Sequence, residues 1–379
     1  MAAIESVRYH ILRDPKTRLE INDDTRLNRQ RNPDQYENRV AFTSLLWHPD
    51  GGLYCGCTAF NRDIFTRFDP GTEKFTSLRY QDVAEEYEVK IHRSLCLASD
   101  GTIYSATACL YTLDQRLKAP GGSIFRYFPP AWRAAGGGEA ARIQKLCIPA
   151  RHDYPQTITL DEERKLIYGL TQPVFRFFVY HIDTGEVEDY DYQGSITHIS
   201  ALDDEGCFWS TWDAVRHYLF KYDPRTRQIT YFNKGIPEGA KFADIMYRGA
   251  GPVDCMINGR DGYLYIGTTG GTLCRLDPRT ADVAYLGRPH PTRRLPGLAL
   301  MADGRILCAG GDQEGGYLAI YDRKTNGWEH LGELVEPRTG NKLYRVHDLC
   351  LSGDGRTAYV AETDVPARSG YLWEAKLKL

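Results

Sequence analysis

Histidine, arginine and tyrosine side chains gather in a few short segments of the 379-residue chain. These segments are Lys90-Ile-His92-Arg93, Arg151-His152-Asp153-Tyr154, Thr197-His198, Tyr247-Arg248-Gly249 and Tyr344-Arg345-Val346-His347-Asp348. Arginine can bind a carboxylate or sulfate through two parallel hydrogen bonds, and histidine or tyrosine can transfer protons once its surroundings shift its pKa. Trp212 offers an apolar ring on which a sugar can lie, and His217 and Arg368 add further polar groups. This mixture favours an anionic carbohydrate as ligand.

A recurring module must position these segments: an apolar strand, an Asp-Gly turn, a strand rich in Tyr and Thr, and a strand that ends in aromatic-Asp. The turns recur roughly every 40 to 60 residues, as expected of four-stranded propeller blades with loops of variable length. Aspartate before glycine or proline favours a turn, because its carboxylate can hydrogen-bond the backbone two residues on. The turn aspartates are Asp50, Asp100, Asp161, Asp204, Asp261, Asp303 and Asp354.

Seven such modules fit the sequence and predict an all-β, seven-bladed β-propeller that forms a single domain over residues 1–379. The seventh module lacks a fourth strand, because only residues 377–379 follow its third strand at residues 370–376. Residues 6–11 have the pattern of the missing strand. We therefore expect the N-terminal strand to close the last blade, which removes exposed strand edges from the ring.

In such a propeller, the polar segments lie where the innermost strands begin, at the top of the central channel. Six of the ten histidines fall on this face, namely His92, His152, His198, His217, His290 and His347. Structural roles stay open: His347-Asp348 can cap a strand, Tyr247-Arg248 can stack to hold a loop, and His198 can be a satisfied inward-facing histidine. Neutral imidazoles that converge on the axis would form a zinc or manganese site, so a divalent metal at the channel histidines also stays open.

Composition excludes several classes of protein. A formal net charge of −3 without basic blocks argues against nucleic acid as the main partner. A mean hydropathy of −0.47 and the lack of a long apolar window argue against a membrane protein. The ten cysteines mostly lie singly in apolar runs, which is typical of free thiols in a reducing compartment. No apolar leader is present at the N-terminus, so we expect a cytoplasmic protein, or a secreted one if a leader was removed; the oligomeric state stays open.

The architecture and the His/Arg/Tyr lining resemble the seven-bladed propeller polysaccharide lyases, which include ulvan lyases, rhamnose-glucuronate lyases and oligogalacturonate lyases. The resemblance spans the chain as architecture and only short stretches as motif, namely Tyr344-Arg-Val-His-Asp348, Ala361-Glu-Thr-Asp364 and Arg368-Ser-Gly-Tyr-Leu-Trp373. It implies β-elimination at a uronic acid. A cation neutralises the C5 carboxylate, a Tyr or His removes the C5 proton, and a Tyr or His protonates the leaving O4 oxygen.

This resemblance assigns expected roles to the polar segments. The expected catalytic residues are His92, with His152 or His198 as a further proton carrier, Tyr247 as base or acid, and Arg248 as a carboxylate clamp. The expected substrate-binding residues are Arg93, Tyr154, Trp212, His217, Arg345, His347 and Arg368.

Two other functions remain open. A glycoside hydrolase acting on a glucuronate-bearing glycan would need two opposed carboxylates at about 5 to 10 Å. Its candidate carboxylates are Asp63, Asp153, Asp213, Asp348 and Asp364. A non-catalytic propeller would instead bind a protein or an anionic ligand on its top face, and an exposed apolar patch there would favour the protein partner.

Overall fold

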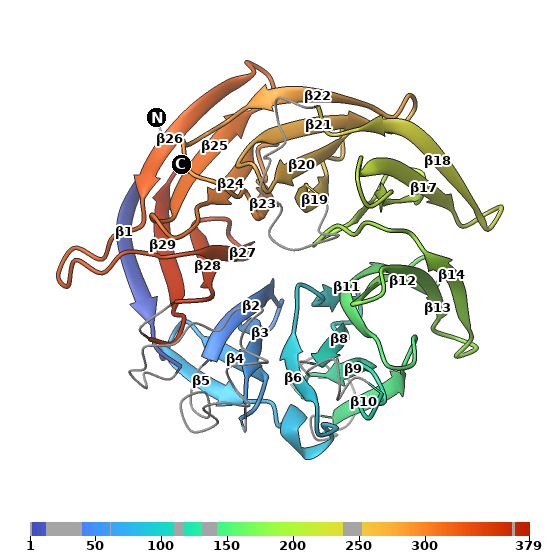
Figure 1. Ribbon diagram of the computed structural model, residues 1–379. Helices are drawn as coiled ribbons and strands as arrows, with labels where there is room; N and C mark the ends of the chain where they lie inside the picture. Colours follow the sequence, from blue (N-terminus) through green and yellow to red (C-terminus); the bar gives the residue numbers. More distant parts are fainter. Residues whose placement is uncertain are drawn as a thin grey trace.

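The computed structural model shows a ring of antiparallel β-sheets around a central axis (Figure 1). It describes residues 2–12, 40–60, 62–109, 117–130, 142–237, 252–365 and 368–379. Over these ranges the only helix is the three-residue 3-10 helix η1 (Tyr80–Asp82). No helix within them is long and apolar enough to span a membrane.

Four of the sheets contain four strands each, in chain order. The second strand of each of these sheets is buried along most of its length, as expected where both faces of a sheet are covered by neighbouring sheets. Their strands are β11 (Tyr154–Asp161), β12 (Leu166–Gln172), β13 (Arg176–His181) and β14 (Val187–Tyr192); β15 (Ala201–Leu202), β16 (Phe208–Trp212), β17 (Tyr218–Asp223) and β18 (Gln228–Gly235); β19 (Val253–Asn258), β20 (Leu264–Thr268), β21 (Leu273–Asp277) and β22 (Asp282–Gly287); and β23 (Gly297–Leu300), β24 (Ile306–Gly310), β25 (Tyr317–Asp322) and β26 (Gly327–Glu333).

A larger sheet of nine strands fills the arc before β11. Its strands are β2 (Val40–Trp47), β3 (Leu53–Ala59), β4 (Phe65–Asp69), β5 (Lys74–Ser77), β6 (Glu88–Ile91), β7 (Cys96–Leu97), β8 (Ile103–Cys109), β9 (Ile124–Phe128) and β10 (Arg142–Cys147). Strand β6 pairs with β8 and meets β3 through the single pair Thr58–Lys90. Two groups of four consecutive strands, β2 to β5 and β7 to β10, are therefore linked within the sheet through β6 and this one backbone pair.

The N-terminal strand closes the ring, as the sequence predicts. β1 (Ala3–His10) pairs antiparallel with β29 (Leu372–Lys378), which continues to β28 (Thr357–Glu362) and β27 (Val346–Leu351). The observed strand begins three residues earlier than the predicted residues 6–11. The N-terminal strand therefore forms the outer edge of this sheet, next to the C-terminal strand (Figure 1), and β29 has no open edge over this length.

The predicted turns use glycine for its freedom at positive φ. Gly51 has φ +81° after Asp50, and Gly262 has φ +84° after Asp261. The carboxylate of Asp50 accepts hydrogen bonds from Gly52 N at 2.8 Å and from the Tyr54 hydroxyl at 2.9 Å. The repeated aspartate thus fixes both its turn and an aromatic side chain of the second strand.

One turn differs from its predicted pattern. Asp203, rather than Asp204, accepts from Cys207 N at 2.9 Å and from Trp209 Nε1 at 2.8 Å. Asp204 instead accepts from the Asn258 amide at 3.0 Å, which links this turn to the neighbouring sheet.

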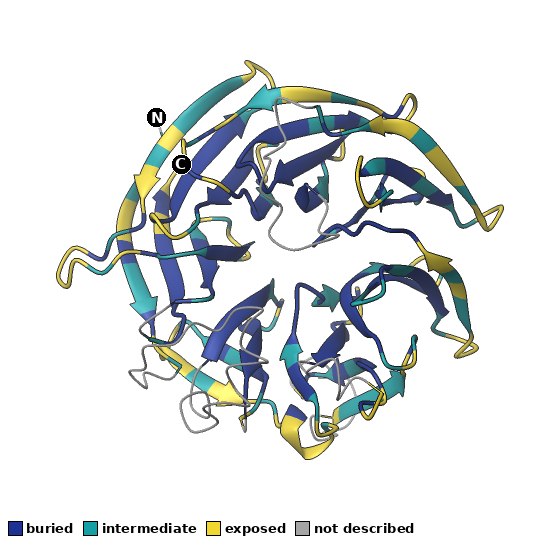
Figure 2. Cartoon of the chain, viewed as in Figure 1, coloured by how far each residue is buried: buried dark blue, intermediate teal, exposed yellow. Residues whose placement is uncertain are grey.

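Burial decreases from the axis outward (Figure 2). All seven residues of β3 are buried, whereas β5 has none that is fully buried. The ten cysteines are free thiols, seven of them buried and three partly buried, which confirms the prediction for this residue type. Burial raises the pKa of the Cys207 thiol to about 11 and that of Cys96 to about 12, so these thiols act as small apolar side chains.

Glu374 on β29 ties the N-terminal strand to the ring. Its carboxylate accepts from Arg8 Nη2 at 2.5 Å and lies 3.0 Å from His10 Nε2, and the Glu374 side chain is only 3% exposed. Burial alone would raise the pKa of Glu374, but the bonds with His10 and Arg8 outweigh it and hold the pKa below its ordinary value.

We expect Glu374→Gln to lower the free energy of unfolding by about 1 to 3 kcal/mol at pH 7. A carboxyl whose pKa is lowered on folding stabilises the fold above its unfolded pKa, and this contribution disappears as the pH falls through the folded pKa. The difference between wild type and variant should therefore shrink below about pH 4.5. Urea unfolding at several pH values measures it, with Glu163→Gln, whose side chain is 86% exposed, as the matched control. A difference that stays constant down to pH 3 would contradict this reading.

Candidate functional site

A β-bulge interrupts four of the strands that lie nearest the axis (Figure 1). The bulged residues are Thr43 in β2, Gln156 in β11, Asp254 in β19 and His347 in β27. Each bulge lies near the end of its strand that is remote from the Asp-Gly turn. A bulged residue is left out of the regular ladder and can direct its polar groups elsewhere. These four positions therefore supply backbone carbonyls and side chains to the axis.

Three histidines meet at this level of the ring. The ring centroids of His92 and His347 are 4.9 Å apart, and those of His92 and His198 are 5.8 Å apart. All three side chains are buried. His92 Nδ1 donates to the carbonyl of Gln156 at 2.8 Å, and His347 Nδ1 donates to the carbonyl of Thr43 at 3.0 Å. Because a carbonyl accepts only, both rings carry the proton on Nδ1 and present Nε2 as the basic nitrogen.

A buried carboxylate joins the third histidine to two arginines. Asp254 is fully buried, and its Oδ1 lies 3.1 Å from His198 Nδ1 and 3.1 Å from Arg93 Nη1. Arg294 binds the same carboxylate with two hydrogen bonds, at 2.9 Å from Nε and 3.0 Å from Nη2. Burial alone would raise the pKa of Asp254, but Arg294 and His198 outweigh it and hold the pKa well below its ordinary range. Asp254 is therefore ionised.

Arg93 reaches across the axis to these partners. Its backbone φ is +45°, in the left-handed region, and its N–H donates to the Thr43 carbonyl at 3.3 Å. Its guanidinium donates to the carbonyls of Asp254, at 2.7 Å, and of Pro296. The remaining donor, Nε, is buried and makes no hydrogen bond to the part of the chain that the structure describes. One buried cationic donor beside the histidines therefore has no hydrogen-bond partner within the described residues.

The histidines lie in cationic surroundings. Burial, followed by Lys90 and His198, lowers the pKa of His92 well below 6.5. Burial, followed by His92, Arg93, Lys90 and Arg294, does the same for His347. Both imidazoles are therefore neutral at pH 7, and the cations that act on them favour an anion as the ligand of this site.

No protein-family model matches the chain, and no curated protein sequence does. Among solved structures, a catalytically inactive histidine-to-alanine variant of virginiamycin B lyase from Staphylococcus aureus, with quinupristin, is similar over 99% of this chain and 100% of its own, at 14% identity and a TM-score of 0.63. The extracellular domain of a protein described as a hybrid two-component system from B. thetaiotaomicron is similar over 95% of this chain, at 11% identity and a TM-score of 0.58, and the chain spans 39% of its length. The chain has a β-propeller fold. At these identities the likeness shows the fold alone.

Arg345, expected as a carboxylate clamp, and Arg368, expected to shape a sugar subsite, are bound to the protein's own carboxylates. Arg345 Nε donates to Asp312 at 2.5 Å and its Nη1 donates to Asp364 at 2.9 Å. Arg368 binds Glu362 with two hydrogen bonds, at 2.7 and 2.9 Å. Arg93 is likewise engaged at both Nη atoms. Their role in substrate binding stays a prediction.

Four other expected residues form contacts outside the histidine cluster. His152, at φ +63°, hydrogen-bonds the carbonyl of Ala119 at 2.8 Å, and the Tyr154 hydroxyl donates to Gln172 at 3.1 Å. His217 bonds with the Ser195 hydroxyl at 2.8 Å. Trp212 Nε1 donates to the Phe232 carbonyl at 3.1 Å, and the Trp212 ring packs on Tyr231. Tyr247 and Arg248 lie outside the described residues.

Asp254 and Arg294 are the site residues that the sequence analysis missed. Asp254 is an acidic residue near the start of a buried inner strand, and it occupies the same bulge position in β19 that His347 occupies in β27. Aligning the modules on their inner strands, rather than on their turns, would have placed Asp254 with His347. Arg294 gives no comparable signal, because it lies in the loop before β23.

The described residues offer little to a metal ion. Within them, no group of three or more His, Cys, Asp or Glu side chains is arranged to hold one. The divalent metal stays a prediction from the sequence, without support from this geometry.

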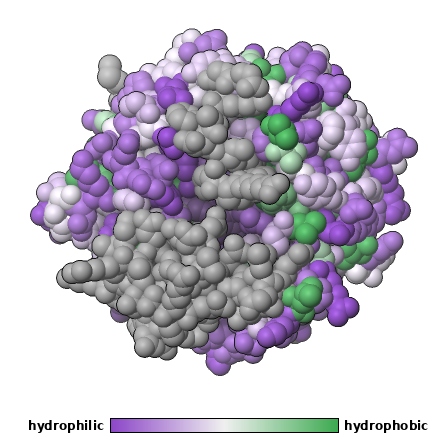
Figure 3. Space-filling view, in the orientation of Figure 1, coloured by the Kyte–Doolittle hydropathy of each residue, from purple (hydrophilic) through white to green (hydrophobic). Residues whose placement is uncertain are grey.

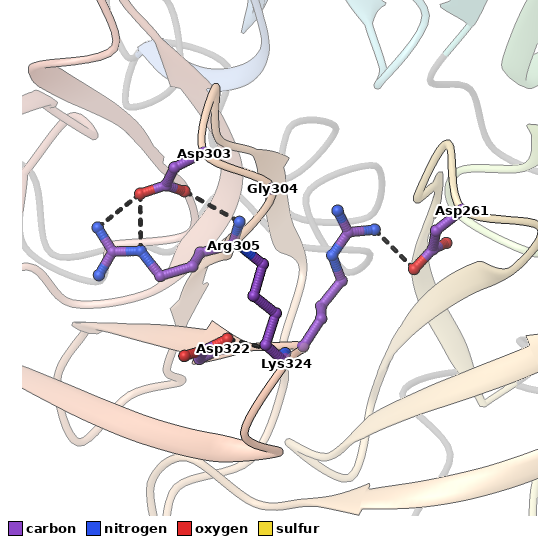
Figure 4. Close-up of a pocket in the computed structure, with 7 residues that line it drawn as sticks. Asp261, Asp303, Gly304, Arg305, Asp322 and Lys324 are labelled. Atoms are coloured by element: carbon purple, nitrogen blue, oxygen red, sulfur yellow. Dashed lines mark hydrogen bonds and ion pairs between the residues drawn. The ribbon is translucent and has the colours of Figure 1, made fainter.

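A separate pocket of about 410 Å³ lies among the turns, at the opposite end of the strands from the histidines (Figure 4). Arg305 Nε donates to Asp303 at 2.8 Å, and Arg323 Nη1 lies 2.7 Å from Asp261. The turn aspartates of two modules therefore bind the arginines that line this pocket. The acidic and basic side chains that line this pocket therefore neutralise one another.

Proposed function

We propose that this propeller cleaves a uronic-acid-containing poly- or oligosaccharide by β-elimination. The observation that carries the proposal is the buried pair His92 and His347, whose Nε2 atoms are basic and whose surroundings are cationic. A reaction that begins by removing a proton next to a carboxylate needs such a neutral base beside a cation.

The proposed reaction uses His92 as the proton carrier. The uronate carboxylate binds beside Arg93, whose Nε is the donor without a partner among the described residues, and its neutralisation acidifies the C5–H bond. His92 Nε2 takes the C5 proton, the electron pair forms the C4–C5 double bond, and the C4–O4 bond breaks. The resulting imidazolium donates the proton to O4, which leaves as a hydroxyl. No water is consumed, and His92 returns to its neutral form.

The character of the exposed surface favours a small polar ligand over a protein partner. In the described part of the face shown in Figure 3, hydrophilic residues predominate and hydrophobic ones lie scattered. A contiguous apolar patch would have favoured a protein partner.

Glycoside hydrolysis is the second candidate, because two axial carboxyl groups have the raised pKa that an acid catalyst needs. Burial raises the pKa of Asp348 and of Asp364. Asp348 accepts from Leu45 N at 2.8 Å and Asp364 binds Arg345, so both carboxyls have structural partners. Of the other candidates, Asp63 and Asp213 bind loop backbone.

We infer seven blades in a single domain over residues 1–379. Four strands of the nine-stranded sheet, β2 to β5, would form one blade, and β7 to β10 the next. Five further sheets of four strands complete the ring.

Near-UV absorbance of the protein with a panel of ulvan, rhamnose-glucuronate, pectic and glycosaminoglycan fragments tests the function. We expect the absorbance to rise with one class, because elimination leaves a C4–C5 unsaturated uronate. New reducing ends without a rise in absorbance would favour hydrolysis, and no change in any glycan would favour a binding propeller.

A further inference from the structure

The Asp254 carboxylate contacts three titratable or charged side chains near the axis, and each of them comes from a segment outside its own sheet. It lies in β19, whereas His198, Arg93 and Arg294 come from the segments that lead into β15, β7 and β23. Each of the three directs a side-chain nitrogen to this single carboxylate, at 2.9 to 3.1 Å. A buried carboxylate is stable in this state only because cations and hydrogen bonds compensate its desolvation.

We propose that Asp254 is a positioning residue that fixes the proton of His198 on Nδ1 and leaves its Nε2 as the basic nitrogen, like those of His92 and His347. This inference rests on the proposed function for its catalytic meaning. The geometry that supports it is the 3.1 Å separation between His198 Nδ1 and Asp254 Oδ1. This is an ion-pair contact rather than an aligned hydrogen bond, but an unprotonated Nδ1 would place its lone pair beside the negative carboxylate, so the proton is favoured on Nδ1. Asp254 is held in place by the two bonds from Arg294.

The arrangement gives the cluster three imidazoles of one tautomer. Asp254 also places a negative charge next to the cations, which stabilises the positive charge that forms on the histidines when the C5 proton is taken up. The groups that face His198 are Asp254, Arg93, Arg294 and His92. Among them only Asp254 is negative, so its removal should make a protonated His198 less favourable.

Nuclear magnetic resonance of the full chain labelled with ¹⁵N-histidine tests this inference without a substrate. The signal of His198 is assigned by its loss in His198→Asn. In the wild type we expect His198 to be neutral at pH 7 with Nδ1 protonated and Nε2 unprotonated. Finding the proton on Nε2 would overturn the inference, even if no variant of Asp254 folds.

Asp254→Asn provides the second arm. We expect the His198 titration to move to lower pH in this variant, and the elimination rate with a cleaved glycan to fall on the order of 100-fold. Asp348→Asn is the matched control, because Asp348 is a buried axial carboxyl that accepts from backbone N–H groups, and its loss should leave the His198 titration in place. An unchanged His198 titration in Asp254→Asn would overturn the inference. If no glycan is cleaved by the wild type, the proposed function fails while the His198 signals still decide the role of Asp254.

Discussion

Replacing His92 with glutamine should lower the rate of elimination on the order of 100- to 10,000-fold, the usual contribution of a positioned acid–base group. His92 is the expected proton carrier because its Nδ1 donates to the Gln156 carbonyl at 2.8 Å and its Nε2 is left as the base. His330→Gln, at an exposed position on β26, is the matched control and should retain the wild-type rate. A His92→Gln variant with the wild-type rate would exclude His92 as proton carrier.

The pH dependence of the same reaction follows from the direction of the pKa shift. Burial, and then Lys90 and His198, lowers the pKa of His92 well below 6.5. A base acts in its neutral form, so a lowered pKa keeps it active as the pH falls. We expect kcat/KM to stay constant between about pH 7.5 and 6.5, and a loss of half the rate near pH 6.5 would contradict this assignment.

Glu362→Leu should reduce the free energy of unfolding by about 3 to 5 kcal/mol, because removing one partner of a buried ion pair leaves the other uncompensated. Glu362 is fully buried and accepts four hydrogen bonds. Two come from Arg368, at 2.7 and 2.9 Å, and two from the backbone N–H groups of Tyr344 and Tyr371, at 2.7 and 2.8 Å. The shift of the guanidinium chloride midpoint measures the effect.

An exposed ion pair serves as the control for this substitution. Asp282 is 67% exposed and lies 2.8 Å from Lys234 Nζ, and exposed pairs contribute about 0 to 1 kcal/mol. Asp282→Leu should therefore move the midpoint little. If Glu362→Leu moves it no further than Asp282→Leu does, the buried network around Glu362 does not stabilise the last sheet.

Turn chemistry made the ring of sheets predictable. The turns at Asp50-Gly51 and Asp261-Gly262 were predictable because their hydrogen bonds and positive φ values depend only on adjacent residues. The closing strand was predictable because a last module with three strands leaves an edge that another segment must cover. β1 indeed pairs with β29, although it begins at Ala3.

Side chains at the axis were predictable only in part. His92, His198 and His347 could be placed there because they start inner strands. Asp254 was missed because the modules were aligned on their turns, although it occupies the same bulge position in β19 that His347 occupies in β27. Arg345 shows a second reason why the site could be predicted only in part. An arginine at this position suggested a clamp for the substrate carboxylate, but its partners Asp312 and Asp364 could not be identified because they lie far from it in the sequence.

The mass of the products made from a uronate-containing oligosaccharide tests the central claim most directly. Elimination moves a proton from C5 to O4 and adds no atoms, so the two product masses should sum to that of the substrate. Hydrolysis adds one water, which an incubation in ¹⁸O-labelled water would place in the products. We predict products without added water and without ¹⁸O from the wild type, together with a loss of product in His92→Gln. Products that carry one added water would contradict elimination and favour glycoside hydrolysis.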